Sequence, residues 1–187
     1  MKLILGFSVP LLFGYLFQQL YNLVDTMIVG QFLGVDALAA VGATSPLSGL
    51  IIGFLMGLAN GFAIVTAQKF GAGKKESVRK SFALSLMMGS AIALLLTVIG
   101  LLFLHPILTF LNVPEHLVNM AAQYIFIIIA GMLATFLYDA CAASLRALGD
   151  TVTPLVILAV SVTLNIAGDL FFILVIKAGV QGAAIAT

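Results

Sequence analysis

The sequence FQQLYNLVDTMIVG, residues 17–30, places polar side chains inside a long apolar segment. Gln18, Tyr21, Asn22 and Asp25 are spaced i, i+3, i+4 and i+7, so in a helix they form one stripe. A carboxylate near the middle of a bilayer costs at least about 2.5 to 3.5 kcal/mol on insertion scales, and this stripe is therefore expected to face other helices or water. Asp25 is the first candidate functional residue.

The composition of the chain indicates a membrane protein. Of its 187 residues, 63% are hydrophobic and 8% are charged, whereas soluble domains are about half apolar and about a quarter charged. Apolar stretches of the roughly 20 residues needed to cross a bilayer recur along the whole length. We expect an all-α membrane protein with a single transmembrane domain over residues 1–187.

The apolar stretches predict a six-helix transmembrane bundle, with five complete helices and the start of a sixth. The expected helices cover residues 3–31, 37–67, 82–104, 117–145 and 154–176, and the sixth begins near residue 180. Thr153 followed by Pro154 predicts an N-cap and a first helical position for the fifth helix.

Basic residues indicate the orientation of the bundle. Seven of the eight fall on one side of the predicted helices: Lys2, Lys69, Lys74, Lys75, Arg79, Lys80 and Arg146. Only Lys177 falls on the other side. The positive-inside bias therefore predicts a multi-pass plasma-membrane protein with a cytoplasmic N-terminus. The cluster at 69–80 is expected to contact lipid headgroups, and it is too small a basic surface to predict nucleic-acid binding.

The predicted second helix has a glycine at every fourth position, at Gly49, Gly53, Gly57 and Gly61. Apolar burial gives helices little reason to associate in lipid, and small residues at this spacing let two backbones approach closely. We expect tight helix packing on this face. A sliding surface between helices is the alternative.

A second acid, Asp169, is predicted at the same depth as Asp25. From helix rise, Asp25 lies about 13 Å and Asp169 about 12 Å from the outer ends of their helices. Tyr21 and Asn165 each lie four positions earlier on the same helix face as an acid. Two buried acids without a Lys or Arg in the membrane predict a mobile cation, either a proton or a hard metal ion held by oxygens. The alternative is a pair of neutral carboxylic acids that only hold helices together.

A third acid lies on the opposite side of the membrane. Asp139 precedes Arg146 by seven residues, which places it about 10 Å from the cytoplasmic end of the fourth predicted helix. We expect an inner-side structural or gating residue there.

Four stretches together resemble the multidrug and toxic compound extrusion (MATE) family of cation-coupled exporters. They are LYNLVDTMIVG (20–30) followed by LAAVGAT (38–44), LRALGDTVTP (145–154) and LNIAGDLFFI (164–173), together with Pro10. The resemblance covers essentially the whole chain. It implies two six-helix lobes that export organic cations in exchange for H⁺ or Na⁺. The chain would be the N-terminal lobe, truncated in its sixth helix and lacking the C-terminal lobe.

The resemblance also implies roles for individual residues. Asp25 would be the coupling acid with Tyr21 as its neighbour, Asn165 and Asp169 would form the second pair, and a Thr187 hydroxyl would complete the cation site. Any Na⁺ would be held by Asp25, Asn165, Asp169 and Thr187, and no other cofactor is implied. Gln18 and Asn22 would line the substrate cavity, and helix one would bend at Pro10. Many relatives read Leu-Asp-Pro where this chain has Gly168, Asp169 and Leu170, so the backbone of the fifth helix is expected to differ there.

Other function classes fit the sequence less well. A related flippase for lipid-linked oligosaccharides would be expected to carry cationic side chains in its cavity, and this sequence places none at depth. A non-transporting scaffold could dimerise through the glycine face. An intramembrane enzyme is not predicted, because no His-rich metal set or nucleophile and base pair is visible.

Overall fold

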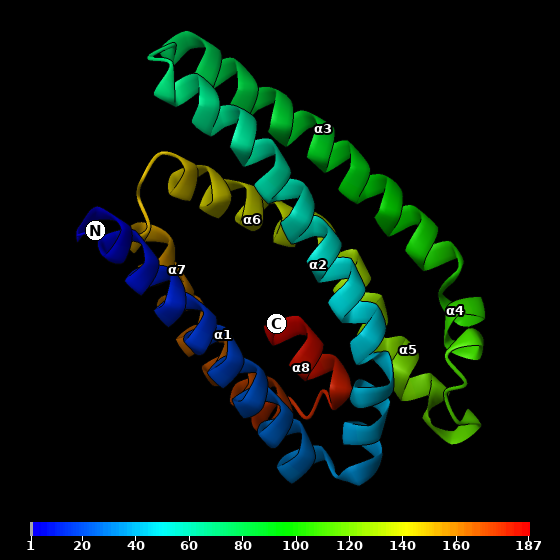
Figure 1. Ribbon diagram of the computed structural model, residues 1–187. Coiled ribbons are helices and arrows are strands. Elements are labelled where there is room, and N and C mark those ends of the chain that lie inside the picture. Colours follow the sequence, from blue (N-terminus) through cyan, green and yellow to red (C-terminus); the bar gives the residue numbers. More distant parts are fainter. Residues whose placement is uncertain (1) are drawn as a thin grey trace.

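The computed structural model describes residues 2–187, and the side chains of residues 8–187 (Figure 1). The described residues form helices and contain no strand, which confirms the all-α prediction. The elements are α1 (Lys2–Leu33), α2 (Val35–Gly71), α3 (Lys75–Leu102), α4 (Leu104–Phe110), α5 (Glu115–Ala130), α6 (Met132–Ala147), α7 (Val152–Leu170), the π-helical turn η1 (Phe171–Val175) and α8 (Val180–Ala186).

The segment expected as one helix over 117–145 is broken. Its two parts, α5 and α6, meet at Gly131 and are bent by 46°. Glycine stabilises a helix interior less than any other residue except proline, so a break is favoured there. A short helix, α4, also occupies part of the connection between the helices expected over 82–104 and 117–145.

The start of α7 differs from the predicted N-cap. The helix begins at Val152, and Thr153 lies inside it. Asp150 does the capping instead, because its Oδ1 accepts hydrogen bonds from the backbone N–H groups of Val152 (3.1 Å) and Thr153 (2.9 Å). The first N–H groups of a helix have no acceptor within the helix, and the Asp150 carboxylate supplies one for two of them.

Within the described residues, three helical segments are long and apolar enough to cross a bilayer on their own: α2, α3 and the combined α7 and η1. The bent pair α5 and α6 would provide a fourth span. The expected count of six spans is therefore not confirmed. The start of the last helix is confirmed, because α8 begins at Val180.

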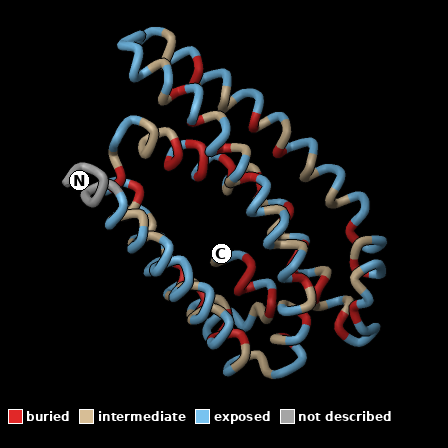
Figure 2. The backbone as a smooth tube through the Cα atoms, viewed as in Figure 1, coloured by how far each residue is buried: buried red, intermediate tan, exposed pale blue. Residues whose placement is uncertain are grey.

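The helices pack in two groups. The larger core joins α2, α3, α5 and α6, and at its centre the ring of Phe136 lies against Gly89 on α3. The second core joins α1, α2, α7 and α8 around Val29 and Ala183. In Figure 1, α1 runs beside α7 on one side, α2, α3 and α6 lie on the other, and α8 lies between the two arms. Figure 2 shows buried positions concentrated on α6 and α8.

The glycine face of α2 does not pack tightly within this chain, so that prediction was wrong. A Cβ added at Gly49, Gly53, Gly57 or Gly61 would meet nothing within 4 Å, and all four residues are exposed. The helix turns its opposite face, with Leu55, Ala59 and Ala63, toward the core. Among the described residues, no helix therefore packs closely on the glycine face of α2.

Candidate functional site

Asp25 and Asp169 come together where α1 lies against α7. The two carboxyl groups lie close enough to act on each other electrostatically. Asp169 is fully buried at 0% exposure, and Asp25 is half-buried. The two acids that the sequence placed at one depth therefore form a pair in space.

Several buried polar atoms at this site have no hydrogen-bond partner among the described residues. Asp25 Oδ1, both carboxyl oxygens of Asp169 and both amide atoms of Asn165 are buried without a hydrogen-bond partner among the described residues. The nearby hydroxyls are engaged elsewhere. Tyr21 Oη donates to Thr187 Oγ1 at 3.2 Å, and Thr187 Oγ1 donates to the carbonyl of Ala183 at 2.9 Å. Buried polar groups normally have partners, so this group of atoms is arranged to receive one.

Two glycines bring α8 close enough to α7 and η1 for Thr187 to reach the site. A Cβ at Gly168 would lie 3.2 Å from Ala186 Cβ, and one at Gly182 would lie 3.0 Å from Phe172 Cβ and 3.2 Å from its carbonyl carbon. Gly168 immediately precedes Asp169. The close packing of α7 on α8 therefore occurs beside the acid itself.

The segment Gly168, Asp169, Leu170 is helical, and the helix changes at the next residue. Residues Phe171–Val175 form the π-helical turn η1 directly after Leu170. Such turns are rare and often occur at functional sites. The backbone irregularity therefore begins two residues after Asp169, and Asp169 itself lies in regular α-helix.

Sequence analysis missed one member of the cluster, Tyr124 on α5. Its side chain is only 7% exposed, and its hydroxyl lies within electrostatic range of Asp25, Tyr21 and Asp169. Its position in the apolar run YIFIIIA, residues 124–130, was the available signal. The residue belongs to a different helix, so only the packing of α5 on α8 reveals its place.

The polar stripe of α1 divides between two environments. Tyr21 and Asp25 turn toward the acid pair, whereas Gln18 and Asn22 are exposed, and Asn22 donates a hydrogen bond to Gln19 Oε1 at 3.3 Å. Exposed amides within a membrane helix are unfavourable against lipid, so this face suits water or another polar surface. Pro10 lies inside α1 and is half-buried.

The electrostatics of the pair favour one added positive charge. Two full negative charges at about 4 Å repel by about 4 kcal/mol at an effective dielectric constant near 20. A shared proton would act as the missing donor between the carboxyl groups. A hard cation would instead find two carboxylates together with the neutral oxygens of Asn165, Thr187 and the two tyrosines.

The side chains of the site offer oxygen atoms from carboxylates, an amide and hydroxyls. Among the described residues, no three His, Cys, Asp or Glu side chains are grouped as a metal site requires. Transition metals in proteins favour imidazole and thiolate ligands. The ligands present here are those of a proton or of an ion such as Na⁺.

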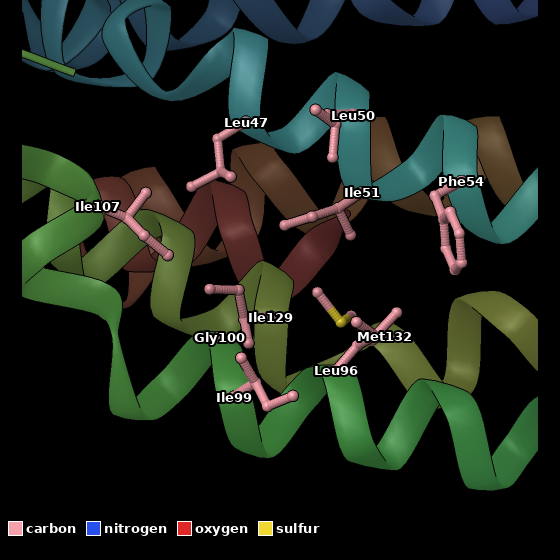
Figure 3. A pocket seen from close by; sticks show the side chains of 10 residues that line it. All are labelled: Leu47, Leu50, Ile51, Phe54, Leu96, Ile99, Gly100, Ile107, Ile129 and Met132. Carbon is pink, nitrogen blue, oxygen red and sulfur yellow. The ribbon is translucent and has the colours of Figure 1, made fainter. Parts of the chain in front are cut away.

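The pocket in Figure 3 is a separate feature. It has a volume of about 220 Å³ and lies between α2, α3 and the α4–α6 segment, with Ile51, Gly100 and Met132 among its lining residues. Its lining residues are all apolar. It has no polar group to orient a charged ligand, and the acid cluster remains the candidate site.

Comparison with known proteins assigns this arrangement to a family. A family model described as MatE matches residues 10–171, which include both acids, Asn165 and most of the helices. The chain belongs to the MatE family. The resemblance seen in the sequence motifs is thereby confirmed.

Several similar proteins are probable multidrug resistance proteins by name. The chain is 37% identical to the "Probable multidrug resistance protein YoeA" of Bacillus subtilis, with 97% of the chain aligned to 40% of that protein. It is 26% identical to an "FAD transporter" of Shewanella oneidensis, with 100% aligned to 42%. The chain thus spans about 40% of the length of these relatives.

Solved structures of the MatE family have the same fold. A MATE transporter in an outward-facing conformation superposes with a TM-score of 0.93 at 30% identity, covering 100% of this chain and 41% of that one. A transporter from Pyrococcus furiosus, described as having a binding pocket of reverse polarity, gives 0.92 at 30% identity, with 100% and 41% covered. The helix arrangement of this chain is therefore that of part of a MATE transporter.

Proposed function

We propose that the chain is the N-terminal lobe of a cation-coupled exporter, in which Asp25 and Asp169 bind the driving ion. The observation that carries this proposal is the pairing of the buried Asp169 with the half-buried Asp25, since three of their four carboxyl oxygens are buried without a hydrogen-bond partner within the described residues. A permanent salt bridge would make such a site inert. Without one, the pair can take up a positive ion and release it when its surroundings change.

The lobe supplies one wall of a transport pathway. Export requires a second lobe, because alternating access depends on two parts that move against each other around a site. The span of about 40% of its relatives' length is consistent with this role. The C-terminal lobe is then the essential partner, together with membrane lipid.

The substrates are organic cations that leave through the space beside Gln18 and Asn22. These exposed amides offer hydrogen bonds without a fixed positive charge, which suits cationic and weakly polar compounds. Ion uptake at Asp25 would change how α1 lies against α7, with Pro10 as the point where the helix can bend. Drug release and ion binding are thus coupled through one helix.

The orientation of the proposed transporter follows its basic residues. The N-terminus, the α2–α3 turn and the α6–α7 connection lie toward one end of the bundle in Figure 1. This end carries Lys74, Lys75 and Arg146, so we place it on the cytoplasmic side of the plasma membrane.

The decisive test is Asp25→Asn in the complete gene product. Cells carrying this variant should lose gradient-driven efflux of a cationic dye while the protein still inserts into the membrane. Asp36→Asn is the matched control, because Asp36 is an exposed acid in the first turn of α2. Efflux by Asp25→Asn at the rate of the control would refute the coupling role.

Two further measurements distinguish H⁺ from Na⁺ as the driving ion, and an organic-cation exporter from a scaffold or an exporter of anions. Collapse of the pH gradient should stop efflux if H⁺ drives it, and collapse of the Na⁺ gradient should stop it if Na⁺ does. A scaffold would show no flux with either gradient. A transport panel that includes a flavin nucleotide tests whether an anion replaces the organic cation as substrate.

A further inference from the structure

Asp139 is a buried acid outside the proposed ion site. It lies on α6 with Met132, Phe136 and Ala143 at positions i−7, i−3 and i+4, and these residues form one buried helix face. Its exposure is 6%. The acid therefore lies within the interface between α6 and the helices packed on it.

The surroundings of Asp139 belong to the larger core. Its face of α6 packs on α2 and α3 through Ala59, Ala63 and the contact of Phe136 with Gly89. The Asp25–Asp169 pair lies instead beside the second core, formed by α1, α2, α7 and α8. The two acidic sites are thus held by different helix contacts.

The carboxyl group of Asp139 has an unpartnered oxygen. Its Oδ2 is buried without a hydrogen-bond partner among the described residues. On the helices packed against α6, Thr66 Oγ1 donates to the Phe62 carbonyl at 3.4 Å, and Ser85 Oγ donates to the Ser81 carbonyl at 2.8 Å. These two hydroxyl protons are therefore not given to the Asp139 carboxyl group.

Fixed charges near Asp139 are sparse. The interacting groups are Arg146, seven residues later on the same helix, and the adjacent Tyr138. The helices packed on α6 carry other titratable groups, and none of them is among the groups that act on the Asp139 carboxyl: Asp36, Lys69, Lys75, Glu76, Arg79, Lys80, Glu115, His116, Tyr124 and Asp169. Arg146 is two helical turns away and half-buried. A carboxylate could pair with it only if the packing around Asp139 loosened.

We propose that Asp139 is a second proton-binding site of the lobe, separate from the Asp25–Asp169 pair. The packed face holds the neutral acid, whose own O–H needs only one acceptor. Loosening of α6 from α2 would admit water or the Arg146 guanidinium and allow the proton to leave toward the cytoplasmic end. The lobe then has one site for a positive ion in each of its two helix groups, and the Asp139 site takes a proton. This inference does not depend on transport or on which ion drives it.

Infrared spectroscopy of the complete gene product in lipid tests the proposal. The carbonyl stretch of a protonated carboxylic acid is followed as the pH is raised. In the Asp25→Asn, Asp169→Asn double variant, a protonated-acid band that disappears with rising pH should remain. Adding Asp139→Asn should remove that band, whereas adding Asp36→Asn should leave it.

The comparison has a clear opposite outcome. Identical spectra for the double variant with and without Asp139→Asn would overturn the proposal. If Asp139→Asn prevents folding, Asp139→Glu is measured in the same double variant. A displaced band then supports the assignment, because glutamic and aspartic acid differ in frequency, and an unmoved band overturns it.

Discussion

Tyr21 and Thr187 are 166 positions apart in the sequence, and their hydroxyls form a hydrogen bond of 3.2 Å. The bond joins α1 to the end of α8 directly beside the two acids. Both hydroxyl protons are used in hydrogen bonds, because Thr187 Oγ1 in turn donates to the Ala183 carbonyl. The carboxyl groups of Asp25 and Asp169 are consequently left to bind an added ion.

The Tyr21–Thr187 bond should be measurable as a coupling between two substitutions. Tyr21→Phe and Thr187→Ala should each lower the free energy of unfolding, and the double variant should lose less than their sum by about 0.5 to 1 kcal/mol. Unfolding in mixed micelles provides the four values of the cycle. Strict additivity would show that the hydrogen bond contributes nothing to stability.

Gly182→Ala should separate α8 from η1. The added Cβ would meet the backbone of Phe172 at 3.2 Å, and backbone cannot move aside as a flexible side chain can. We expect weaker binding of the driving ion and the loss of the Tyr21–Thr187 coupling, measured by ion titration and by the same cycle. Gly53→Ala is the control, because its Cβ would meet nothing within 4 Å.

Gly89→Ala should destabilise the larger core. A Cβ at this position would overlap Cζ of Phe136, and overpacking of a core typically costs about 1 to 3 kcal/mol. Thermal unfolding of the purified protein checks the loss. Adding Phe136→Leu to Gly89→Ala should restore part of the stability, since it removes the clashing ring.

Gly57→Ala is the matched control on α2. It adds a methyl group where nothing lies within 4 Å and improves helix propensity by about 0.8 to 1 kcal/mol. Stability should stay the same or rise slightly. A loss as large as that of Gly89→Ala would show that the glycine face of α2 packs against a surface outside the described residues.

The Asp150 cap should make the stability of α7 depend on pH. Hydrogen bonds from the Thr153 side chain, and from the backbone N–H groups of Thr153 and Val152, lower the pKa of Asp150 from its ordinary 3.8. A lowered pKa in the folded state means that the contribution to stability is present above pH 3.8 and is lost as pH falls through the folded value. Asp150→Ala should therefore be less stable than the wild type at pH 7.

Thermal unfolding between pH 7 and pH 3 checks this dependence. The difference between wild type and Asp150→Ala should shrink toward the acid end. Asp150→Asn should keep part of the cap at pH 7, because an amide oxygen also accepts hydrogen bonds from the helix N-terminus. A difference that is constant with pH would show that the ionised carboxylate has no role.

Helix periodicity predicted much of the fold because lipid imposes a simple rule on each segment. The backbone must satisfy its own hydrogen bonds, so apolar runs become helices, and the beginning of α8 at Val180 follows correctly. The break at Gly131 was missed because a single glycine is compatible with a continuous membrane helix. The capping role of Asp150 was missed because Thr153 with Pro154 gives an equally good local pattern.

The acids were predictable, but their partners were not. An aspartate in an apolar helix stands out in any sequence, and helix rise alone gave Asp25 and Asp169 the same depth. Their surroundings depend on rotation and on close contact between helices that are far apart in the chain. Tyr124 entered the cluster, and Gln18 and Asn22 turned away from it, for this reason.

The sequence by itself determined that this chain belongs in a membrane and which side chains would be costly there, since transfer of charge into lipid depends mainly on residue type and depth. Only the tertiary structure decided which of these side chains meet. Gly168 and Gly182 allow α8 to lie against α7 and η1, and that approach brings Thr187 beside Tyr21. The physical reason is that a helix sequence fixes the faces of each helix, whereas the distance between two faces depends on the atoms of both.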